Sequence, residues 1–226
     1  GIRIADFGYT TSTGSGKQLL NPTIAHVGGD DDFRQFFIRR DAPDETVSAN
    51  GLEDGNVLTF DFDRDFRGDA EAELDSTTLE NGNIVVVLDR DGRDGREEMI
   101  LVMIVTPDGD ILRQFDLGRS DVQQFDPTVI ALSGGGVVVA FSDEDDDVDP
   151  VYLGFVANGT GLTGRTEFGT GADVGGSNNN EPALAPLPDG GFVAFYDNDV
   201  AEQIRGQRFD AEGNFVGEDF LVSDGS

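Results

Sequence analysis

The sequence predicts an all-β protein of β-propeller type, an array of four-stranded blades with about four and a half units of ~54 residues each. Two observations lead to this fold class. Hairpins of similar composition recur at a nearly constant spacing along the chain. No segment of convincing length carries the apolar stripe of an amphipathic helix. We therefore read residues 1–226 as one domain of β-repeats.

The first hairpin of each unit is identified by its turn glycines. Its form is a polar residue before Pro or Ser, a short apolar strand, a Gly-containing turn, a second apolar strand and an acidic loop. In the last unit the turn is Pro-Asp-Gly-Gly at 188–191, and the second strand runs from Phe192 to Tyr196. The hairpins start 54, 51 and 55 residues apart, at Asn21, Asp75, Asp126 and Glu181. This period is typical of repeat architectures.

A second hairpin completes each unit. The segments that begin at Met99, Pro150 and Gln203 each hold a strand, an Asn-Gly, Asp-Gly or Glu-Gly turn, and another strand. The segment from Glu45 fills this slot less neatly. Two hairpins give four strands of about five residues, the size of a propeller blade. The predicted blades are 21–74, 75–125, 126–180 and 181–226.

The first twenty residues match the second hairpin alone, because "IRIADFGYTTSTGSGKQLL" lines up with "IRGQRFDAEGNFVGEDFLV" near the other end of the chain. Residues 1–20 are therefore a predicted half blade. A closed ring usually completes a split blade with strands from both termini, yet the last unit already looks complete. Either the repeat phase is wrong at one end, or the chain is a piece of a larger propeller. A pair of β-sandwiches or a β-solenoid would also accommodate these strands.

The charge of the chain limits its partners. Forty-five acidic residues against fifteen basic ones give a formal net charge of −30. Such a chain repels phosphate, so we expect no nucleic-acid partner. We also expect no membrane insertion, because no apolar run approaches the roughly 18 residues that a spanning helix needs. The acids are open to three readings: cation ligands, a surface adapted to high salt as in halophilic and many marine proteins, or solvated loops.

The loops that follow the second strand of the units carry closely spaced carboxylates. Calcium prefers about six to eight oxygen ligands on a loop that can wrap around it, and glycine permits the sharp turn. The chain has no cysteine, so thiolate sites are excluded, and no EF-hand spacing occurs. Calcium is the expected cofactor, with plain solvation of the loops as the alternative. The candidate ligands are Asp89, Asp91, Asp94, Asp143, Asp145, Asp147, Asp197 and Asp199.

Catalytic motifs are scarce in the sequence. His26 is the single histidine, and its place within a strand indicates a structural or surface residue rather than a catalytic base. Paired carboxylates can hydrolyse glycosides, but among forty-five acids the sequence does not select a pair. Tryptophan is absent and tyrosine occurs only three times, which counts against a classical lectin. We therefore expect no catalytic residue.

The last unit resembles a known repeat. Its turn and strand "LPDGGFV" from Leu187, and its hairpin from Gly206 to Asn214, are similar to the repeat of large secreted and surface proteins of Gram-negative bacteria, which often carry repeats-in-toxin calcium motifs. The calcium nonapeptide itself is absent here. The resemblance implies a propeller-like extracellular module with adhesive or structural roles.

The sequence as a whole favours a non-catalytic, secreted or cell-surface module with a structural or adhesive role, stabilised by calcium. Its expected partner is a protein or glycan surface, or another copy of itself. The alternative is a carbohydrate-active propeller, a glycosidase or a lectin, that uses acidic loop residues.

Overall fold

The computed structural model describes residues 18–28, 32–41, 44–51, 57–59, 73–90, 99–117, 121–144, 151–157, 162–168, 179–198 and 201–223. Within these ranges the chain forms four antiparallel sheets of four strands each. No helix in the described part of the chain is long and apolar enough to cross a membrane. The predicted half blade lies almost wholly outside the described residues, because residues 1–17 are not among them.

We call the four sheets blades 1 to 4, and each follows the chain as a simple meander. Blade 1 consists of β1 (Gln18–Gly28), β2 (Asp32–Asp41), β3 (Asp44–Gly51) and β4 (Val57–Thr59). Blade 2 consists of β5 (Leu74–Thr78), β6 (Ile84–Arg90), β7 (Met99–Val105) and β8 (Ile111–Leu117). Blade 3 consists of β9 (Gln123–Ala131), β10 (Gly136–Glu144), β11 (Val151–Ala157) and β12 (Leu162–Phe168). Blade 4 consists of β13 (Asn179–Pro186), β14 (Phe192–Asn198), β15 (Gln203–Phe209) and β16 (Phe220–Ser223).

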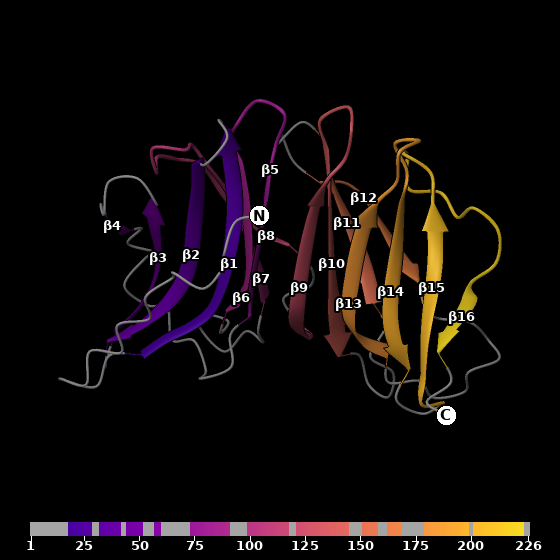
Figure 1. Cartoon of the computed structure of the whole chain (residues 1–226). Helices are drawn as coiled ribbons and strands as arrows, with labels where there is room; N and C mark the ends of the chain where they lie inside the picture. Colours follow the sequence, from indigo (N-terminus) through magenta and orange to yellow (C-terminus); the bar gives the residue numbers. More distant parts are fainter. Residues whose placement is uncertain are drawn as a thin grey trace.

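The blades follow one another in chain order around a common centre. Figure 1 shows blade 1 in indigo at one side and blade 4 in yellow at the other, with blades 2 and 3 between them. The first strands of the blades pack in sequence, β1 against β5, β5 against β9, and β9 against β13. These four strands are therefore the inner strands of a propeller, and the predicted fold class is confirmed. The predicted unit starts all fall within these inner strands.

The turn between the first two strands is the same in three blades. The backbone N–H of Leu79 donates to the carbonyl of the residue four positions later at 2.8 Å, and Leu132 and Leu187 make the same bond at the same distance. Glycine occupies the left-handed conformation inside each turn, for example Gly82 at φ 83° and Gly190 at φ 90°. The leucine-led turn thus fixes which residues of successive blades are equivalent.

The core lies between the blades and is built by alternation along the strands. Val137, Val139 and Phe141 of β10 pack into the cluster shared with blade 2. The intervening Val138 and Ala140 pack into the cluster shared with blade 4. Each of these side chains is at most 1% exposed, because a strand between two blades is buried on both faces. This explains why β10 contains an uninterrupted apolar run. A strand with one face toward solvent would alternate apolar and polar residues instead.

Candidate functional site

Three acidic residues lie six positions before the leucine of the turn in successive blades. They are Glu73 directly before β5, Asp126 in β9 and Glu181 in β13. A fourth acid, Asp75 in β5, lies two residues after Glu73. Because the inner strands pack side by side, these carboxylates line one cavity of about 310 Å³. The remaining residues of its wall are Pro127, Thr128 and Pro182.

Asp126 belongs to this axial cluster of four acids, and its carboxyl group is electrostatically perturbed. Burial of its carboxyl group raises the pKa from the ordinary 3.8 to about 6, with further contributions from the charges of Glu73 and Glu181 and from a hydrogen bond with the Glu73 side chain. A hydrogen bond with the backbone of Glu181 opposes this shift of the pKa. Asp126 therefore keeps its proton into the mildly acidic range in which an isolated aspartate is ionised.

The backbone at two of the acids adopts an uncommon conformation. Asp126 has φ 54° and Glu181 has φ 49°, which is the left-handed region that costs a non-glycine residue about 1 kcal/mol or more. Each is followed by proline, which further restricts the residue before it. Strain of this kind persists where the surroundings enforce it, and it is concentrated at functional sites. It sets the direction in which both side chains leave the inner strands.

Asp75 joins three blades through both of its carboxylate oxygens. Oδ1 accepts from the backbone N–H of Ser76 at 2.7 Å and from the Thr23 hydroxyl of blade 1 at 3.3 Å. Oδ2 accepts from the Thr128 hydroxyl and the Val129 backbone N–H of blade 3, both at 2.9 Å. Because donors of the protein occupy both oxygens, Asp75 holds the blades together and is poorly placed to react with a substrate.

Two of the predicted metal ligands form hydrogen bonds with residues at the start of the inner strands. Asp89, at the end of β6, accepts from the backbone N–H of Glu73 at 2.6 Å. Asp143 in β10 accepts from the Nε2 group of Gln124 at 3.3 Å, and Gln124 lies two residues before Asp126. Both aspartates are buried. They brace the residues that begin the inner strands.

The other predicted ligands are only partly covered by the structure. Asp197 lies half-buried near the end of β14, on a different sheet from Asp89 and Asp143. No group of three or more histidine, cysteine or acidic residues that could hold a metal ion occurs within the described ranges. Calcium binding by the acidic loops remains a prediction. Five of the candidate ligands lie outside the described residues, namely Asp91, Asp94, Asp145, Asp147 and Asp199.

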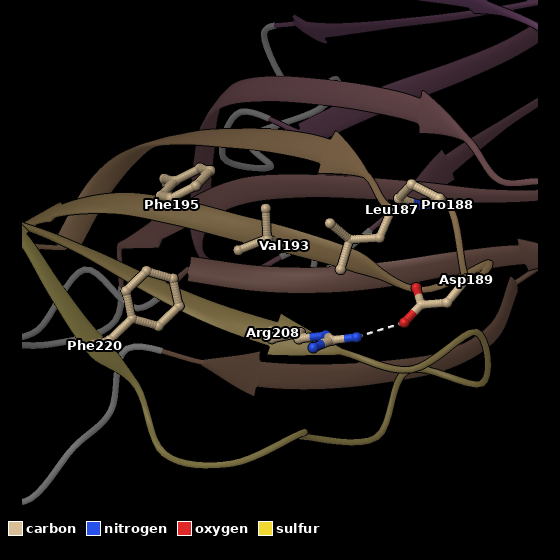
Figure 2. A pocket seen from close by; sticks show the side chains of 7 residues that line it. All are labelled: Leu187, Pro188, Asp189, Val193, Phe195, Arg208 and Phe220. Atoms are coloured by element: carbon tan, nitrogen blue, oxygen red, sulfur yellow. Dashed lines mark hydrogen bonds and ion pairs between the residues drawn. The ribbon is translucent and has the colours of Figure 1, made fainter.

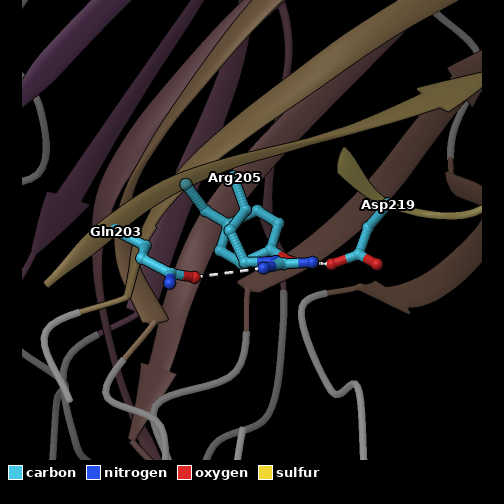
Figure 3. A network of polar contacts seen from close by, with 4 residues as sticks. Gln203, Arg205 and Asp219 are labelled. Carbon is cyan, nitrogen blue, oxygen red and sulfur yellow. Dashed lines mark hydrogen bonds and ion pairs between the residues drawn. The ribbon is translucent and has the colours of Figure 1, made fainter. Parts of the chain in front are cut away.

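A second polar network lies within blade 4 and joins residues of β14 and β15 to the segment before β16. Asp219 accepts from Nε of Arg205 at 2.6 Å and from the Tyr196 hydroxyl at 3.2 Å, while Nη1 of Arg205 also donates to Gln203 at 3.1 Å (Figure 3). Burial and the nearby charge of Asp219 raise the pKa of Tyr196 to about 12. The tyrosine is therefore a neutral donor at physiological pH. This network fixes the buried tyrosine and the segment before β16.

His26, the histidine considered as a catalytic base, lies exposed on β1.

Sequence reasoning searched for the acids in the wrong part of the repeat. It selected the loops after the second strand, where acidic residues are most frequent. The acids of the cavity begin the units instead, as in "DPTV" and "EPAL", where they were read only as polar residues before proline. The repeat position of these acids could have identified them. The first strand of every propeller blade lies at the axis, so equivalent residues of these strands converge there.

The fold and the cavity together define a β-propeller with carboxylates at its axis. Solved structures similar to it include the family 93 α-L-arabinofuranosidase of Fusarium graminearum in complex with arabinobiose (TM-score 0.61, 11% identity, 91% of this chain and 66% of that one). An endo-arabinase from Bacteroides thetaiotaomicron is also similar (TM-score 0.59, 16% identity, 91% of this chain and 81% of that one). A family 117 glycoside hydrolase from the marine bacterium Zobellia galactanivorans is a third (TM-score 0.59, 14% identity, 96% of this chain and 72% of that one).

The chain spans just under two thirds of the length of the arabinofuranosidase. Its sequence matches no protein-family model and no curated protein. At these identities the likeness to solved structures establishes the β-propeller fold alone.

The expectation of a non-catalytic structural or adhesive module is wrong. The three similar structures are glycoside hydrolases, and they favour the alternative reading of a carbohydrate-active propeller. The expectation failed because it treated the acids as surface charge. The repeat instead collects four of them in one cavity and desolvates Asp126 there.

Proposed function

We propose that this protein is a carbohydrate-active propeller that hydrolyses glycosidic bonds at the axial cavity. One feature carries the proposal: Asp126, whose pKa is raised to about 6 by burial and by the charges of Glu73 and Glu181, lines one cavity with these two acids. Glycoside hydrolysis needs a pair of carboxyl groups, one protonated and one ionised, on either side of the scissile bond. Environments that separate the pKa values of neighbouring carboxyl groups are the usual means of producing such a pair.

Asp126 is the general acid of this proposal. Its proton passes to the glycosidic oxygen as the bond to the sugar breaks, and the resulting carboxylate is stabilised by the backbone hydrogen bond from Glu181. Glu73 is hydrogen-bonded to Asp126 and raises the pKa of the Asp126 carboxyl group. Its negative charge opposes ionisation of Asp126 until the substrate takes the proton.

Glu181 is the candidate for the second carboxyl group. Its side chain is exposed and it borders the cavity. The remaining acid, Asp75, is excluded from this role because donors of three blades occupy its two oxygens. Glu181 would act either on the anomeric carbon or on a water molecule beside it, according to the separation of the two carboxyl groups in the complex with the sugar.

The substrate class is a glycan without acidic groups. The arabinofuranosidase that resembles this chain was solved with arabinobiose, a neutral disaccharide. A cavity lined by four acids, in a chain of net charge −30, repels a uronate or a sulfated sugar. The same charge does not disfavour a neutral pentose or hexose. A polysaccharide of this kind agrees with the expected extracellular location.

Hydrolysis of a panel of neutral nitrophenyl glycosides and arabinan or galactan oligosaccharides tests the proposal. The variants are Asp126→Asn and Glu181→Gln, with Glu80→Gln as the matched control because Glu80 is an exposed acid of blade 2 outside the cavity. We expect Asp126→Asn to lower kcat by about 10²- to 10⁴-fold on substrates that need protonation of the leaving group. The control should leave kcat unchanged.

The pH profile gives an independent readout. Activity of the unaltered protein should decline as the pH rises through about 6, because Asp126 then loses its proton. Glu73→Gln should move this decline to lower pH by removing one of the charges that raise the pKa of Asp126. Turnover that persists in Asp126→Asn would contradict the assignment of the acid. Saturable binding of sugars without turnover would replace the hydrolase with a lectin.

A further inference from the structure

Large apolar side chains are exposed on the outer part of blade 4. Six of the nine such side chains that the described ranges leave exposed lie between residues 204 and 222. Phe220, Leu221 and Val222 form most of β16, and Phe215 and Val216 lie in the connection that precedes it. These five side chains are 41–52% exposed. Single exposed apolar residues are common on protein surfaces, but a group of them in one place indicates an interaction surface.

The strand β16 forms the edge of blade 4. It pairs with β15 along one side, with Gly206 opposite Phe220 and Ile204 opposite Ser223. On its other side no described strand pairs with it. The backbone N–H and C=O groups along that outer side can therefore pair with a strand from another molecule. All four residues of β16 are exposed, so an added strand would also cover apolar side chains.

The outer strands of the other three blades have features that oppose such pairing. β8 contains Arg113 and Asp116, and β12 contains Arg165 and Glu167. β4 has only three residues. Charged residues and very short strands are common means by which proteins protect a sheet edge. β16 has the sequence Phe-Leu-Val-Ser, without a charge, so blade 4 has the least protected edge of the four sheets.

An apolar groove of about 510 Å³ adjoins β16 on the face of blade 4 that points away from blade 3. Val193 and Phe195 lie on this face, because they alternate along β14 with residues that pack on blade 3. Figure 2 shows Phe220 of β16 at one end of the groove and the ion pair of Arg208 with Asp189 at the other. The groove therefore begins at the edge strand, and it can take an apolar side chain of a strand that pairs with β16.

The charges around β16 identify the kind of partner. Glu218 is exposed two residues before the strand, and Asp224 follows the strand in the sequence. If two copies of β16 paired side by side, the acids that flank one strand would lie close to those that flank the other, in chains that each carry a net charge of −30. A basic partner is attracted by the same charges. We propose that the outer edge of β16 binds an extended segment of another protein, apolar in its middle and basic at its ends, which adds a fifth strand to blade 4.

Binding of synthetic peptides to the full chain tests the proposal independently of hydrolysis. The test peptide is Lys-Lys-Val-Thr-Val-Ile-Lys-Lys with a fluorescent label, and fluorescence anisotropy measures its binding. One control peptide has glutamate in place of every lysine. The other carries N-methyl groups on alternate backbone amides, which block strand pairing and keep the charge. We expect a Kd of about 10–100 μM for the test peptide, and binding at least about tenfold weaker for both controls. Equal binding of the N-methylated peptide would overturn the proposal, because attraction to the net charge alone would then explain it. Absence of binding of the test peptide at about 1 mM would overturn it as well.

A pair of variants locates the peptide on the chain. Leu221→Lys places a positive charge on β16, which opposes edge pairing and repels the basic ends of the peptide. The matched control is Leu112→Lys on β8, because the two leucines are 50% and 56% exposed. We expect Leu221→Lys to weaken binding by about tenfold or more and Leu112→Lys to leave it unchanged, while both keep the circular dichroism spectrum of the unaltered chain. Equal affinity of the two variants for the peptide would overturn the proposal. So would a dimer of the unaltered chain in sedimentation equilibrium that Leu221→Lys dissociates, because a second copy would then occupy the edge.

Discussion

Replacing Asp126 by asparagine should stabilise the protein at neutral pH, which is unusual for a change of a cavity residue. The rise of the Asp126 pKa from 3.8 to about 6 means that the folded state binds this proton more tightly than the unfolded state does. Between these two pH values the unfolded chain has released the proton and the folded chain has kept it. The free energy of unfolding therefore falls as the pH rises through this window and stays lower above it.

The size of the effect follows from the shift. About two units at 1.36 kcal/mol each give close to 3 kcal/mol, and partial exposure of the carboxyl group reduces this to about 1–2 kcal/mol. Asparagine has nearly the shape of the protonated acid, accepts from the Glu181 backbone and can donate to Glu73. Since it does not ionise, Asp126→Asn should be more stable than the unaltered chain by about 1–2 kcal/mol at pH 7 and about equally stable at pH 3.

Urea unfolding followed by far-ultraviolet circular dichroism at a series of pH values measures this difference. Asp189→Asn is the matched control with the opposite sign. The backbone N–H of Gly191 and the guanidinium of Arg208 lower the pKa of Asp189, so its contribution to stability is present at neutral pH and disappears in acid. Asp189→Asn should therefore be slightly destabilising at pH 7 and neutral in acid. An Asp126→Asn variant that is less stable at pH 7, or whose difference does not change with pH, would refute the raised pKa and with it the general acid.

Three further predictions concern the blades themselves. Asp75→Ala should lower the free energy of unfolding by about 2–3 kcal/mol in urea titrations, because donors of three blades lose their acceptor. Glu80→Ala removes one exposed hydrogen bond, from the backbone N–H of Gly134, and should change the free energy of unfolding by less than about 1 kcal/mol. Phe209→Ala should lower the free energy of unfolding by about 3–5 kcal/mol, because the ring is fully buried and its centroid lies 4.7 Å from that of the stacked Phe192 ring. Phe215→Ala, a truncation of an exposed ring, should lower it by less than about 1 kcal/mol. Calcium should raise the midpoint of thermal unfolding relative to chelator and to potassium chloride, and an unchanged midpoint would remove the calcium prediction.

The fold could be predicted because turn chemistry and alternation are local properties. The leucine-led turn needs glycine in the left-handed conformation, so it is visible wherever it repeats, and the strands on either side follow from it. The burial of individual strands was harder to predict from the sequence. β7 is buried throughout, whereas Ile111 and Leu112 of β8 are 41% and 56% exposed despite their similar hydropathy. The difference is one of position, because β8 lies at the outer edge of its blade.

The candidate site could not be predicted from composition because its acids are unremarkable one by one. Asp75 and Asp126 line the same cavity, yet Asp75 hydrogen-bonds neighbouring blades to one another and Asp126 has a raised pKa. Neither role follows from residue type. What distinguishes them is the set of donors that the neighbouring inner strands and the following residue supply.

The residue after each aspartate supplies a large part of that difference. Ser76 donates its backbone N–H to Asp75 at 2.7 Å. Pro127 follows Asp126 and has no N–H, so the corresponding bond is impossible and the desolvated carboxylate lacks that donor. Pro127→Ser should therefore lower the Asp126 pKa from about 6 toward its ordinary value, by roughly one unit for one charge-assisted hydrogen bond.

The Asp126 carboxyl resonance, followed by nuclear magnetic resonance across a pH titration, reports this pKa directly. The matched control is Pro182→Ser, which makes the same change after Glu181 and leaves the residue that follows Asp126 unaltered. If Pro127→Ser left the titration of Asp126 unchanged, the cause of the raised pKa would lie in the neighbouring carboxylates and burial alone. If it lowered the pKa together with the pH at which hydrolysis declines, then a single proline in the repeat would separate the reactive aspartate from the one that holds the blades together.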